Sequence, residues 1–263
     1  MTSFLATLHF KMLAMKYRGR GETIVQAEYM GSRLLVRVTE DVGKLILAGI
    51  FEIDELTYLL RRIRPDDIFF DVGANVGLFS VVLGNAQPTI AVHAFEPIPL
   101  NVALCEASVH INELTNVRIN RLCVGEVCGD VDFDTAADSA YSSIITAGHK
   151  PSARRSRVPV TTLEHYVAEH NVARIDVMKV DVEGAEKMVL SGGAGLLSEP
   201  DRGPRLVLLE LWESHLAAFG TSVLEVTSMM TSWGYSGFVL QNGERVALQE
   251  RSDLSIYNVF FER

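Results

Sequence analysis

The chain has 263 residues, of which 48% are hydrophobic and 22% charged, a composition that predicts one large α/β domain with additions. Its net charge of −9 argues against a general nucleic-acid binder, because such proteins carry a basic surface that attracts phosphates. No apolar run reaches the ~20 residues that a membrane-spanning helix needs, so we expect no membrane span.

The cysteine pattern favours a reducing compartment. Cys105, Cys123 and Cys128 form no CxxC pair and leave one cysteine unpaired by count, which suits neither a disulfide framework nor a zinc site. Residues 1–16 resemble a secretion signal only faintly, because Lys11 interrupts the apolar centre and no small-residue cleavage site follows. We therefore expect the protein to be cytoplasmic.

Residues 1–64 are predicted to form an extension that packs on a main domain of residues 65–263. Residues 1–20 have the pattern of an amphipathic helix, and residues 22–47 alternate apolar and polar in places, as in a short antiparallel ribbon. A helix over residues 52–63 follows, with apolar residues spaced so that one face is buried.

From residue 68 onward, predicted strands and helices alternate, which indicates an α/β fold with a mostly parallel sheet and helices on both faces. Two closing strands give the sheet an antiparallel end. Residues 127–159 interrupt the alternation with short β-like pieces and a basic loop, and long connections of this kind are often functional. The predicted strands cover residues 68–70, 89–95, 117–124, 175–181, 206–211, 235–240 and 255–261, and the predicted helices 162–169, 185–197 and 222–233, with another beginning near Pro97 and Pro99.

A glycine-rich turn, DVGANVGLFS at residues 71–80, joins the first of these strands to an apolar helix. Gly73 and Gly77 allow the backbone to approach a ligand closely, and the free N–H groups at the start of the helix can hold an anionic group. Asp71 at the end of the strand adds a carboxylate. The sequence therefore predicts that a small-molecule cofactor binds here.

Carboxylates recur at the other strand ends. Ligands of an open α/β sheet bind at the carboxyl ends of its strands, where Glu96, Glu126, Asp181 and Glu210 are found together with Asp71. Glu96 is predicted to accept hydrogen bonds from the hydroxyl groups of a ribose. Together with the glycine-rich turn, these strand-end carboxylates predict a nucleotide-like cofactor.

The loop favours S-adenosylmethionine over a nicotinamide dinucleotide. The dinucleotide pattern GxGxxG uses its middle glycine to make room for a pyrophosphate, whereas this loop has Ala74 and Asn75 there. Asp71 would repel a pyrophosphate but suits the ammonium and sulfonium groups of S-adenosylmethionine. An NAD(P)-dependent oxidoreductase on a similar sheet is the main alternative, and a non-catalytic cofactor-binding scaffold is a second.

Four motifs occur in order, namely DVGANVGLFS, FEPIPLNVALCEASVHIN, VPVTTLEHY and MKVDVEGAE. With this set, residues 49–261 resemble the FkbM family of S-adenosylmethionine-dependent methyltransferases. The resemblance implies a class I methyltransferase fold, with a Rossmann-like seven-stranded mostly parallel sheet. It also implies methyl transfer to a hydroxyl of a sugar, glycan or secondary-metabolite acceptor.

The resemblance also assigns cofactor-binding positions. Val124, Gly125 and Glu126 depart from the residues usual after the third strand of the family, which leaves the adenine contact to Glu126 or to a main-chain group nearby. Glu164 stands where the family more often has aspartate. The positions expected to bind S-adenosylmethionine are Asp71, Gly73, Ala74, Asn75, Gly77, Glu96, Asn101, Glu126 and Asp181.

Methyl transfer to a hydroxyl needs a base near the acceptor oxygen, and Asp181, Glu183, Glu210 and His215 are the candidates for a catalytic role. Glu210 ends an apolar strand, so burial is expected to raise its proton affinity. A divalent metal such as Mg²⁺ could activate the hydroxyl instead, but the sequence establishes no metal site.

The acceptor is predicted to be a small molecule or saccharide. Residues 127–159, which include Tyr141 and His149, are the candidate lid over it. Trp212, Tyr141 and Phe51 are aromatic residues that could stack on a sugar. The sequence leaves the oligomeric state open, with a homodimer as one option.

Overall fold

The computed structural model describes residues 12, 15–16, 23–134, 143–144, 155–248 and 258–263. The predictions for Tyr141, for His149 and for most of the N-terminal helix lie outside these residues. Within them, no helix combines the length and the hydropathy that crossing a bilayer requires.

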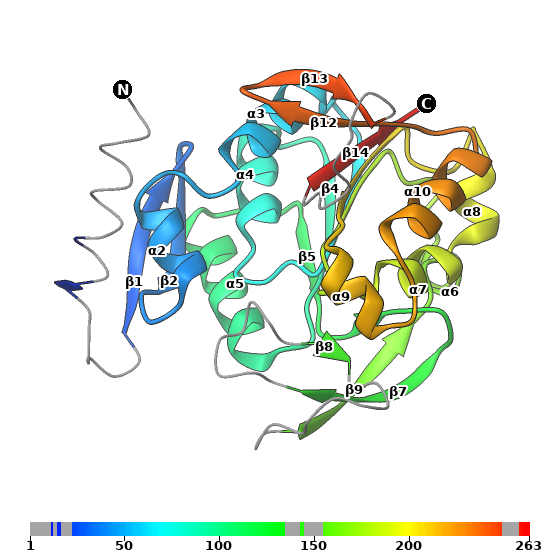
Figure 1. The fold of residues 1–263 in the computed structure, drawn as a ribbon. Helices are drawn as coiled ribbons and strands as arrows, with labels where there is room; N and C mark the ends of the chain where they lie inside the picture. The colour runs from blue at the N-terminus through cyan, green and yellow to red at the C-terminus, as the bar shows by residue number, and fades with distance from the viewer. Residues whose placement is uncertain (1–11, 13–14, 17–22, 135–142, 145–154, 249–257) are drawn as a thin grey trace.

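A twisted central sheet runs through the molecule (Figure 1). The strands from β11 to β5 are parallel, and β14, β12 and β13 add an antiparallel end, as predicted. The sheet has an eighth strand that the sequence did not predict, because the turn at Asn242 and Gly243 folds β13 back onto β12. In spatial order the strands are β13 (Glu244–Ala247), β12 (Ser236–Gln241), β14 (Asn258–Glu262), β11 (Leu206–Glu210), β10 (Val177–Val180), β3 (Ile68–Val72), β4 (Ala91–Phe95) and β5 (Val117–Asn120).

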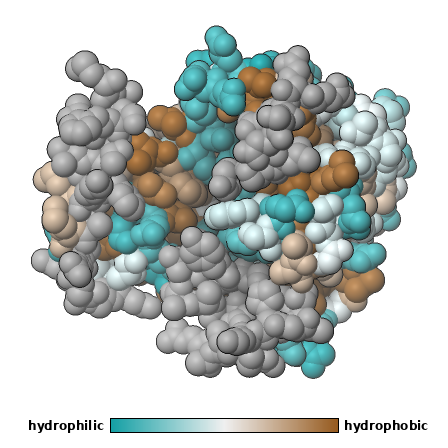
Figure 2. All heavy atoms as spheres, in the orientation of Figure 1, coloured by the Kyte–Doolittle hydropathy of each residue, from teal (hydrophilic) through white to brown (hydrophobic). Residues whose placement is uncertain are grey.

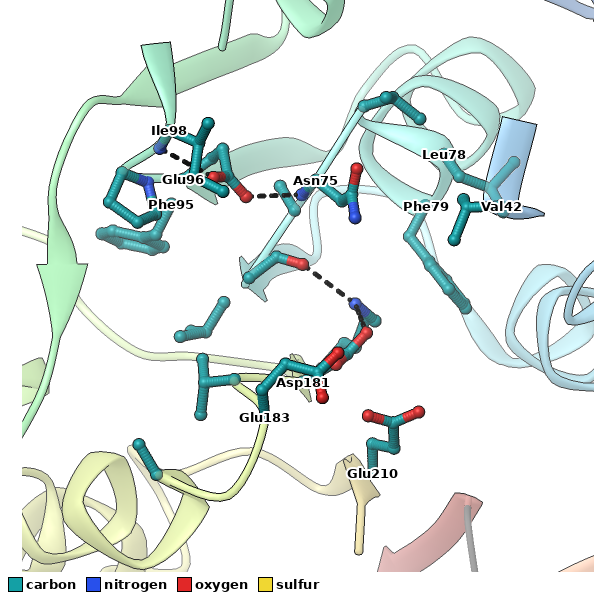
Figure 3. A pocket seen from close by; sticks show the side chains of 18 of the residues that line it. Val42, Asn75, Leu78, Phe79, Phe95, Glu96, Ile98, Asp181, Glu183 and Glu210 are labelled. Carbon is teal, nitrogen blue, oxygen red and sulfur yellow. Dashed lines mark hydrogen bonds and ion pairs between the residues drawn. The ribbon is translucent and has the colours of Figure 1, made fainter. Parts of the chain in front are cut away.

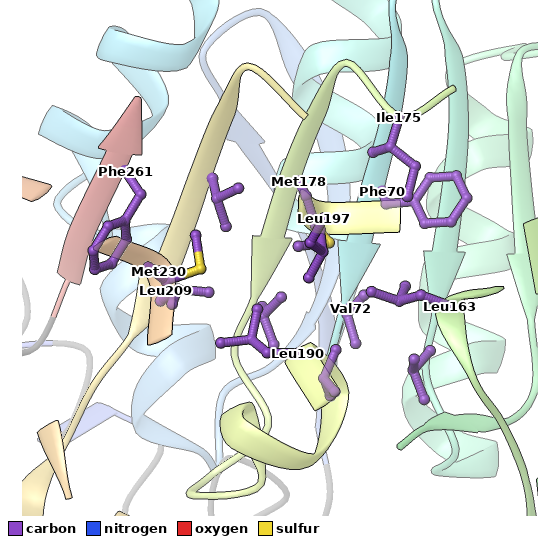
Figure 4. Packing of buried hydrophobic residues seen from close by; sticks show 14 of the residues in the cluster. Phe70, Val72, Leu163, Ile175, Met178, Leu190, Leu197, Leu209, Met230 and Phe261 are labelled. Atoms are coloured by element: carbon purple, nitrogen blue, oxygen red, sulfur yellow. The ribbon is translucent and has the colours of Figure 1, made fainter. Parts of the chain in front are cut away.

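Helices cover both faces of this sheet, which confirms the predicted α/β class (Figure 1). Each face has its own hydrophobic core, because strands that are buried on both sides are apolar along their whole length. Figure 4 shows one of them, in which Phe70 and Met178 of the sheet meet Leu190 and Leu197 from the helices. On one face lie α3 (Ile53–Arg62), α4 (Leu78–Ala86) and α5 (Pro99–Ile111); on the other lie α6 (Leu163–Glu169), α7 (Glu186–Ser191), α8 (Ala194–Ser198), α9 (Glu213–Ala218) and α10 (Val223–Ser232).

The extension begins with a hairpin of β1 (Ile24–Tyr29) and β2 (Ser32–Arg37), which confirms the first part of the predicted ribbon. The second part was wrong, because residues 41–47 form a helix, α2 (Asp41–Leu47), that buries Ile46. The amide of Leu35 on β2 donates to the Ser108 hydroxyl of α5 at 2.9 Å. The hairpin also shares a core with α4 and α5, while the division of the chain at residue 64 stays a prediction.

A separate small sheet consists of β6 (Cys123–Val124), β9 (Arg155–Thr161), β7 (Gly129–Asp134) and β8 (Ser143–Ile144), in this order. The single strand predicted over residues 117–124 was therefore wrong. The chain turns after Asn120, whose carbonyl accepts from the amide of Leu122 and whose side chain donates to the carbonyl of Ala94. As a result β5 stays in the central sheet while β6 pairs with β9.

The helix predicted over residues 185–197 is two helices, α7 and α8. They are separated at Gly192 and Gly193 because the backbone of the next layer lies too close for a side chain. A Cβ at Gly192 would overlap the carbonyl group of Gly125, which directly follows β6. The break therefore brings the α7–α8 connection against the strand end at which the pocket begins.

Candidate active site

The pocket lies where the order of the parallel strands reverses. Chain order runs from β3 through β4 to β5 in one direction and from β10 to β11 in the other, so β3 and β10 flank the switch point. Ligands of open α/β sheets bind outside the carboxyl ends of strands at such a point. Here a cavity of about 240 Å³ is lined by residues at the carboxyl ends of β3, β4, β10 and β11 and by residues of β6.

The cavity also has an apolar side, which α2 and α4 supply through Val42, Leu45, Leu78 and Phe79. In Figure 2, hydrophobic residues gather on the face between the regions that Figure 1 labels α2 and α4. The pocket therefore combines an apolar wall with polar groups at the strand ends, as small-molecule sites commonly do.

Backbone contacts with the ends of β4 and β10 fix the turn that follows β3. The amides of Gly73 and Ala74 both donate to the carbonyl of Phe95 at 3.0 Å. Gly73 has φ 79°, and a Cβ there would overlap the carbonyl oxygen of Asp181. Only glycine fits this approach between the β3 and β10 ends.

Glu96 at the end of β4 is buried and faces the turn (Figure 3). Its carboxylate accepts from the amide of Asn75 at 2.9 Å and from that of Ile98 at 2.8 Å. Burial nevertheless raises the pKa of Glu96 to about 7, since these hydrogen bonds offset desolvation only in part. A rigid carboxyl with further acceptor capacity lies at this end of the pocket, where a ribose is expected.

Asp71 has a different place from the one predicted. It is fully buried and does not line the cavity. One carboxylate oxygen accepts from the hydroxyl of Ser80 at 2.6 Å and from its amide at 3.1 Å, and the other lies 3.7 Å from the ammonium group of Lys179. Burial raises the pKa of Asp71, while the ammonium group of Lys179 and the Ser80 hydroxyl work against this. Asp71 therefore anchors the turn to α4 from a position outside the cavity lining.

Lys179 links the two strand ends. Its ammonium group donates to the carboxylate of Asp181 at 3.0 Å and to the carbonyl of Gly73 at 3.2 Å. Burial disfavours the charged lysine, but the carboxylates of Asp181 and Asp71 outweigh this and raise its pKa. Lys179 therefore stays cationic beneath the pocket and fixes the carboxylate of Asp181.

The motif DVEGAE determines the backbone conformation of the loop after β10. Glu183 has φ 56° and Gly184 φ 104°, and a Cβ at Gly184 would overlap the backbone of His215. The buried carboxylate of Glu186 accepts from the amides of Val182 and Gly184 at 3.1 and 3.2 Å. Glu186 thus holds the loop in place, and Asp181 and Glu183 project from it.

Three carboxylates meet at the other end of the pocket. Asp181, Glu183 and Glu210 each offer an oxygen, and all three oxygens lie within 4.8 Å of one another; in the described part of the chain no further group of this kind occurs (Figure 3). Burial raises the pKa of Glu210, and the neighbouring carboxylate of Asp181 raises it further. Carboxylates this close can share a proton or ligate a hard cation such as Mg²⁺.

His215 stands behind this group rather than in the pocket. Its Nδ1 lies 2.9 Å from the carboxylate of Glu183, and its ring packs on Trp212 with a centroid distance of 4.6 Å. Burial lowers the pKa of His215, while Asp181 acts in the opposite direction. His215 is outside the cavity lining and contacts two residues that belong to it, Glu183 and Trp212.

The structure brings most of the predicted residues to one cavity and leaves others aside. Gly73, Ala74, Asn75, Glu96, Asp181, Glu183 and Glu210 line it, as do Phe51 and Trp212. Asn101 is a buried residue of α5, and Glu126 is exposed. The residues set aside from the lining are Asp71, Gly77, Asn101, Glu126 and His215.

Sequence reasoning missed two parts of the lining. Leu122, Cys123 and Val124 form the wall beyond Glu96, where the adenine contact had been expected from Glu126 or from a main-chain group nearby. The end of the predicted strand could have located this wall, but its side chains that face the pocket are apolar and gave no sign of a binding role. Val42 and Glu52 come from the extension, and nothing in the sequence places them near the strand ends.

Comparison with known proteins gives a consistent answer. A family model described as "Methyltransferase FkbM domain" matches residues 71–236, more than half of the chain. The chain is 26% identical to "31-O-demethyl-FK506 methyltransferase FkbM" of Streptomyces tacrolimicus, over 50% of this chain and 61% of that protein. It is 27% identical to "Hexuronic acid methyltransferase AglP" of Haloferax volcanii, over 66% and 69% respectively. It is 23% identical to "2-O-methyltransferase NoeI" of Sinorhizobium fredii, over 52% and 61%.

The chain thus spans about three fifths of the length of the first and third of these relatives. Among solved structures, precorrin-6y C5,15-methyltransferase from Geobacter metallireducens resembles it with a TM-score of 0.47 and 10% identity. That alignment covers 81% of this chain and 88% of the other.

Proposed function

The chain belongs to the FkbM family of methyltransferases, and from this premise we propose that it transfers a methyl group from S-adenosylmethionine to a hydroxyl of a sugar or other small metabolite. Its α/β sheet is that of the class I methyltransferases, as predicted. The names of the relatives support an acceptor of this kind, since they refer to hexuronic acid, to demethylated FK506 and to 2-O-methylation.

One observation carries the proposal, namely that the pocket has two chemically different ends. Glu96 and the glycine turn lie at one end, suited to the ribose and methionine parts of S-adenosylmethionine. Asp181 and Glu210 lie at the other, suited to a hydroxyl acceptor (Figure 3). A dinucleotide would instead need room for a pyrophosphate at the place where this turn has Ala74 and Asn75.

The reaction we propose is an in-line displacement. The acceptor oxygen forms a bond to the methyl carbon as the bond from that carbon to sulfur breaks, and the sulfonium becomes the neutral thioether of S-adenosylhomocysteine. The hydroxyl proton passes to the carboxylate pair of Asp181 and Glu210. Lys179 donates to the carboxylate of Asp181 at 3.0 Å and holds it in place as the member of the pair that accepts the proton. Orientation of the two substrates supplies much of the remaining acceleration.

Thermal unfolding with and without ligands tests the cofactor. S-adenosylhomocysteine should raise the melting temperature, because a ligand that binds only the native state stabilises it. NAD should leave the melting temperature unchanged. A shift with NAD and none with S-adenosylhomocysteine would reject the proposal. Binding of S-adenosylhomocysteine without methyl transfer to any sugar or hydroxylated metabolite would favour the non-catalytic scaffold.

Glu210→Gln tests the role of the carboxylate pair. We expect turnover to fall by roughly a hundredfold or more, because Asp181 loses the neighbouring carboxyl that shares the accepted proton, while affinity for S-adenosylhomocysteine changes by less than about twofold. Glu244→Gln, an exposed position on the same sheet, is the matched control. Loss of activity with a chelator, restored by Mg²⁺, would assign these carboxylates to a metal instead.

We also propose a cytoplasmic location. Cys105, Cys123 and Cys128 are all free thiols, which supports a reducing compartment.

A further inference from the structure

The extension contributes one wall of the pocket, although it lies outside the residues that match the family. Asp41, Val42 and Leu45 of α2, together with Phe51 and Glu52 of the α2–α3 connection, line the cavity. Two of these five are acidic, and Asp41 is exposed and paired with Lys44 at 2.7 Å. Glu52 introduces a second carboxyl group into the pocket from a part of the chain that the strand-end motifs do not include.

Glu52 has an unusual conformation for its position. It is the N-terminal capping residue of α3, yet its backbone is left-handed, with φ 49° and ψ 36°, and its side chain caps no amide of the helix. An acidic residue at this position ordinarily accepts from the amides of the first turn. Here the carboxyl oxygen is instead 3.5 Å from the side-chain nitrogen of Asn258.

This contact places Glu52 beside the carboxylate end of the pocket. Asn258 on β14 is the direct partner of Glu210 on β11 in the sheet register. The carboxyl of Glu52 interacts electrostatically with Lys179 and Asp181, and also with Glu210. Glu52 therefore lines the same part of the cavity as the proposed proton acceptors.

The connection that carries Glu52 is fixed by the hairpin. The hydroxyl of Tyr29, a buried residue of β1, donates a hydrogen bond to the carbonyl of Phe51. A side chain on a backbone held in this way needs little further ordering when it binds a ligand.

The charges that surround this space favour an uncharged acceptor. Among the described residues that line the cavity, six are acidic and Lys179 is the one basic residue. Lys179 is already paired with Asp181, so an anionic acceptor would find no unpaired cation among the described residues of the lining. Phe51 and Trp212 in the same lining offer aromatic faces of the kind on which the apolar face of a sugar ring can pack.

We propose that Glu52 is an acceptor-recognition residue, whose carboxyl hydrogen-bonds a ring hydroxyl of a neutral sugar while another hydroxyl of that sugar faces Asp181 and Glu210. This inference rests on the proposed function and adds the class of acceptor to it. Burial raises the pKa of Glu52 to about 8, so its protonated form is available to donate to a hydroxyl oxygen as well as to accept from it.

Ligand-observed NMR on the full chain saturated with S-adenosylhomocysteine tests the inference. The probes are methyl glucoside, methyl galactoside and methyl mannoside, with methyl glucuronide as the anionic counterpart of the first. We expect at least one neutral glycoside to bind and the glucuronide to bind more weakly. Glu52→Ala should weaken glycoside binding by roughly tenfold, as expected for loss of a buried hydrogen bond, and Glu52→Gln should largely retain it.

The controls separate the possible failures. Asp54→Ala removes an exposed acid two residues away and should leave every affinity unchanged. S-adenosylhomocysteine should bind both Glu52 variants as it binds the wild type, which shows that they are folded. No glycoside binding to wild type that is loaded with S-adenosylhomocysteine, or equal binding to Glu52→Ala, would overturn the role of Glu52 alone. No binding of S-adenosylhomocysteine to the wild type would overturn the proposed function itself.

Discussion

At the scale of single residues, two opposing effects act on the ionisation of Glu96. Its burial disfavours the charged carboxylate, whereas the amides of Asn75 and Ile98 and the expected ribose hydroxyls all favour it. Because the pKa of Glu96 is about 7, the charge of this residue changes within the physiological range. Ligand binding should therefore depend on pH.

We expect S-adenosylhomocysteine to bind more tightly as the pH rises. If ribose hydroxyls donate to the ionised carboxylate, the dissociation constant should fall roughly tenfold from about pH 6 to about pH 8, as the ionised fraction of Glu96 grows. Glu96→Gln should bind more weakly at both values and show no trend. Isothermal titration calorimetry measures both proteins, and the same trend in Glu96→Gln would assign the effect to another group.

Residues of the site were predictable where the signal is local. Glu96 and Gly73 stand at fixed places in a strand–turn–helix pattern, so their roles follow from neighbours in sequence. Glu52 and Leu122 were not predictable, because they reach the cavity through packing between segments that are distant in the chain. Asp71 was predicted correctly at the end of its strand, but the sequence did not indicate that it is buried under the turn.

At the scale of elements, the turn after β3 depends on close contact with the loop after β10. Gly73 is the point of contact, and Gly220 offers a matched comparison. Both have positive φ, 79° and 70°, but a Cβ at Gly73 would overlap the carbonyl of Asp181 while no atom lies within 4 Å of a Cβ at Gly220. The two positions therefore share backbone strain and differ in steric overlap.

Alanine substitutions at Gly73 and Gly220 distinguish the effect of backbone strain from that of steric overlap. Gly220→Ala should lower the free energy of unfolding by about 1 kcal/mol, through backbone strain alone, and should still bind S-adenosylhomocysteine. Gly73→Ala should be destabilised further and should lose the thermal shift, because the turn and the Asp181 loop must move apart. Urea unfolding and ligand-dependent melting measure the two effects. Equal behaviour of the two variants would show that this contact does not shape the site.

The elements that were predicted best are the central strands, because their continuous apolar runs fit a sheet buried on both faces. β3, β10 and β11 were located within a few residues for this reason. The break between β5 and β6 was missed because it depends on pairing with β9, some thirty residues later. α2 was missed because its charged residues and Gly43 obscure the helical spacing.

At the scale of the whole molecule, the doubly wound sheet explains why the site is so acidic. Strand ends that face one another across the switch point bring Glu96, Asp181 and Glu210 to a single cavity. Glu52 and Glu186 add buried carboxyls around it. Such groups keep their protons in the folded protein at pH values where the unfolded chain has released them.

This arrangement predicts that the ligand-free protein loses stability as the pH rises. Burial raises the pKa of Glu52 to about 8 and those of Glu96 and Glu186 to about 7, from 4.5 in each case. Between these values the native state binds more protons than the unfolded state, so the free energy of unfolding falls with increasing pH. The slope is on the order of 1 kcal/mol per pH unit for each group that is protonated only in the native state.

His93 opposes this trend at lower pH, which defines the window for the measurement. Burial lowers the pKa of His93 from 6.5 to about 4, so its contribution increases stability as the pH rises toward 6.5 and is constant above it. Urea unfolding between about pH 6.5 and about pH 8 should therefore show the decline without this offset. Glu186→Gln should flatten the decline, and a wild-type stability that stays level or rises would contradict the prediction. Saturating S-adenosylhomocysteine should also flatten it, because the bound ribose favours the ionised form of Glu96.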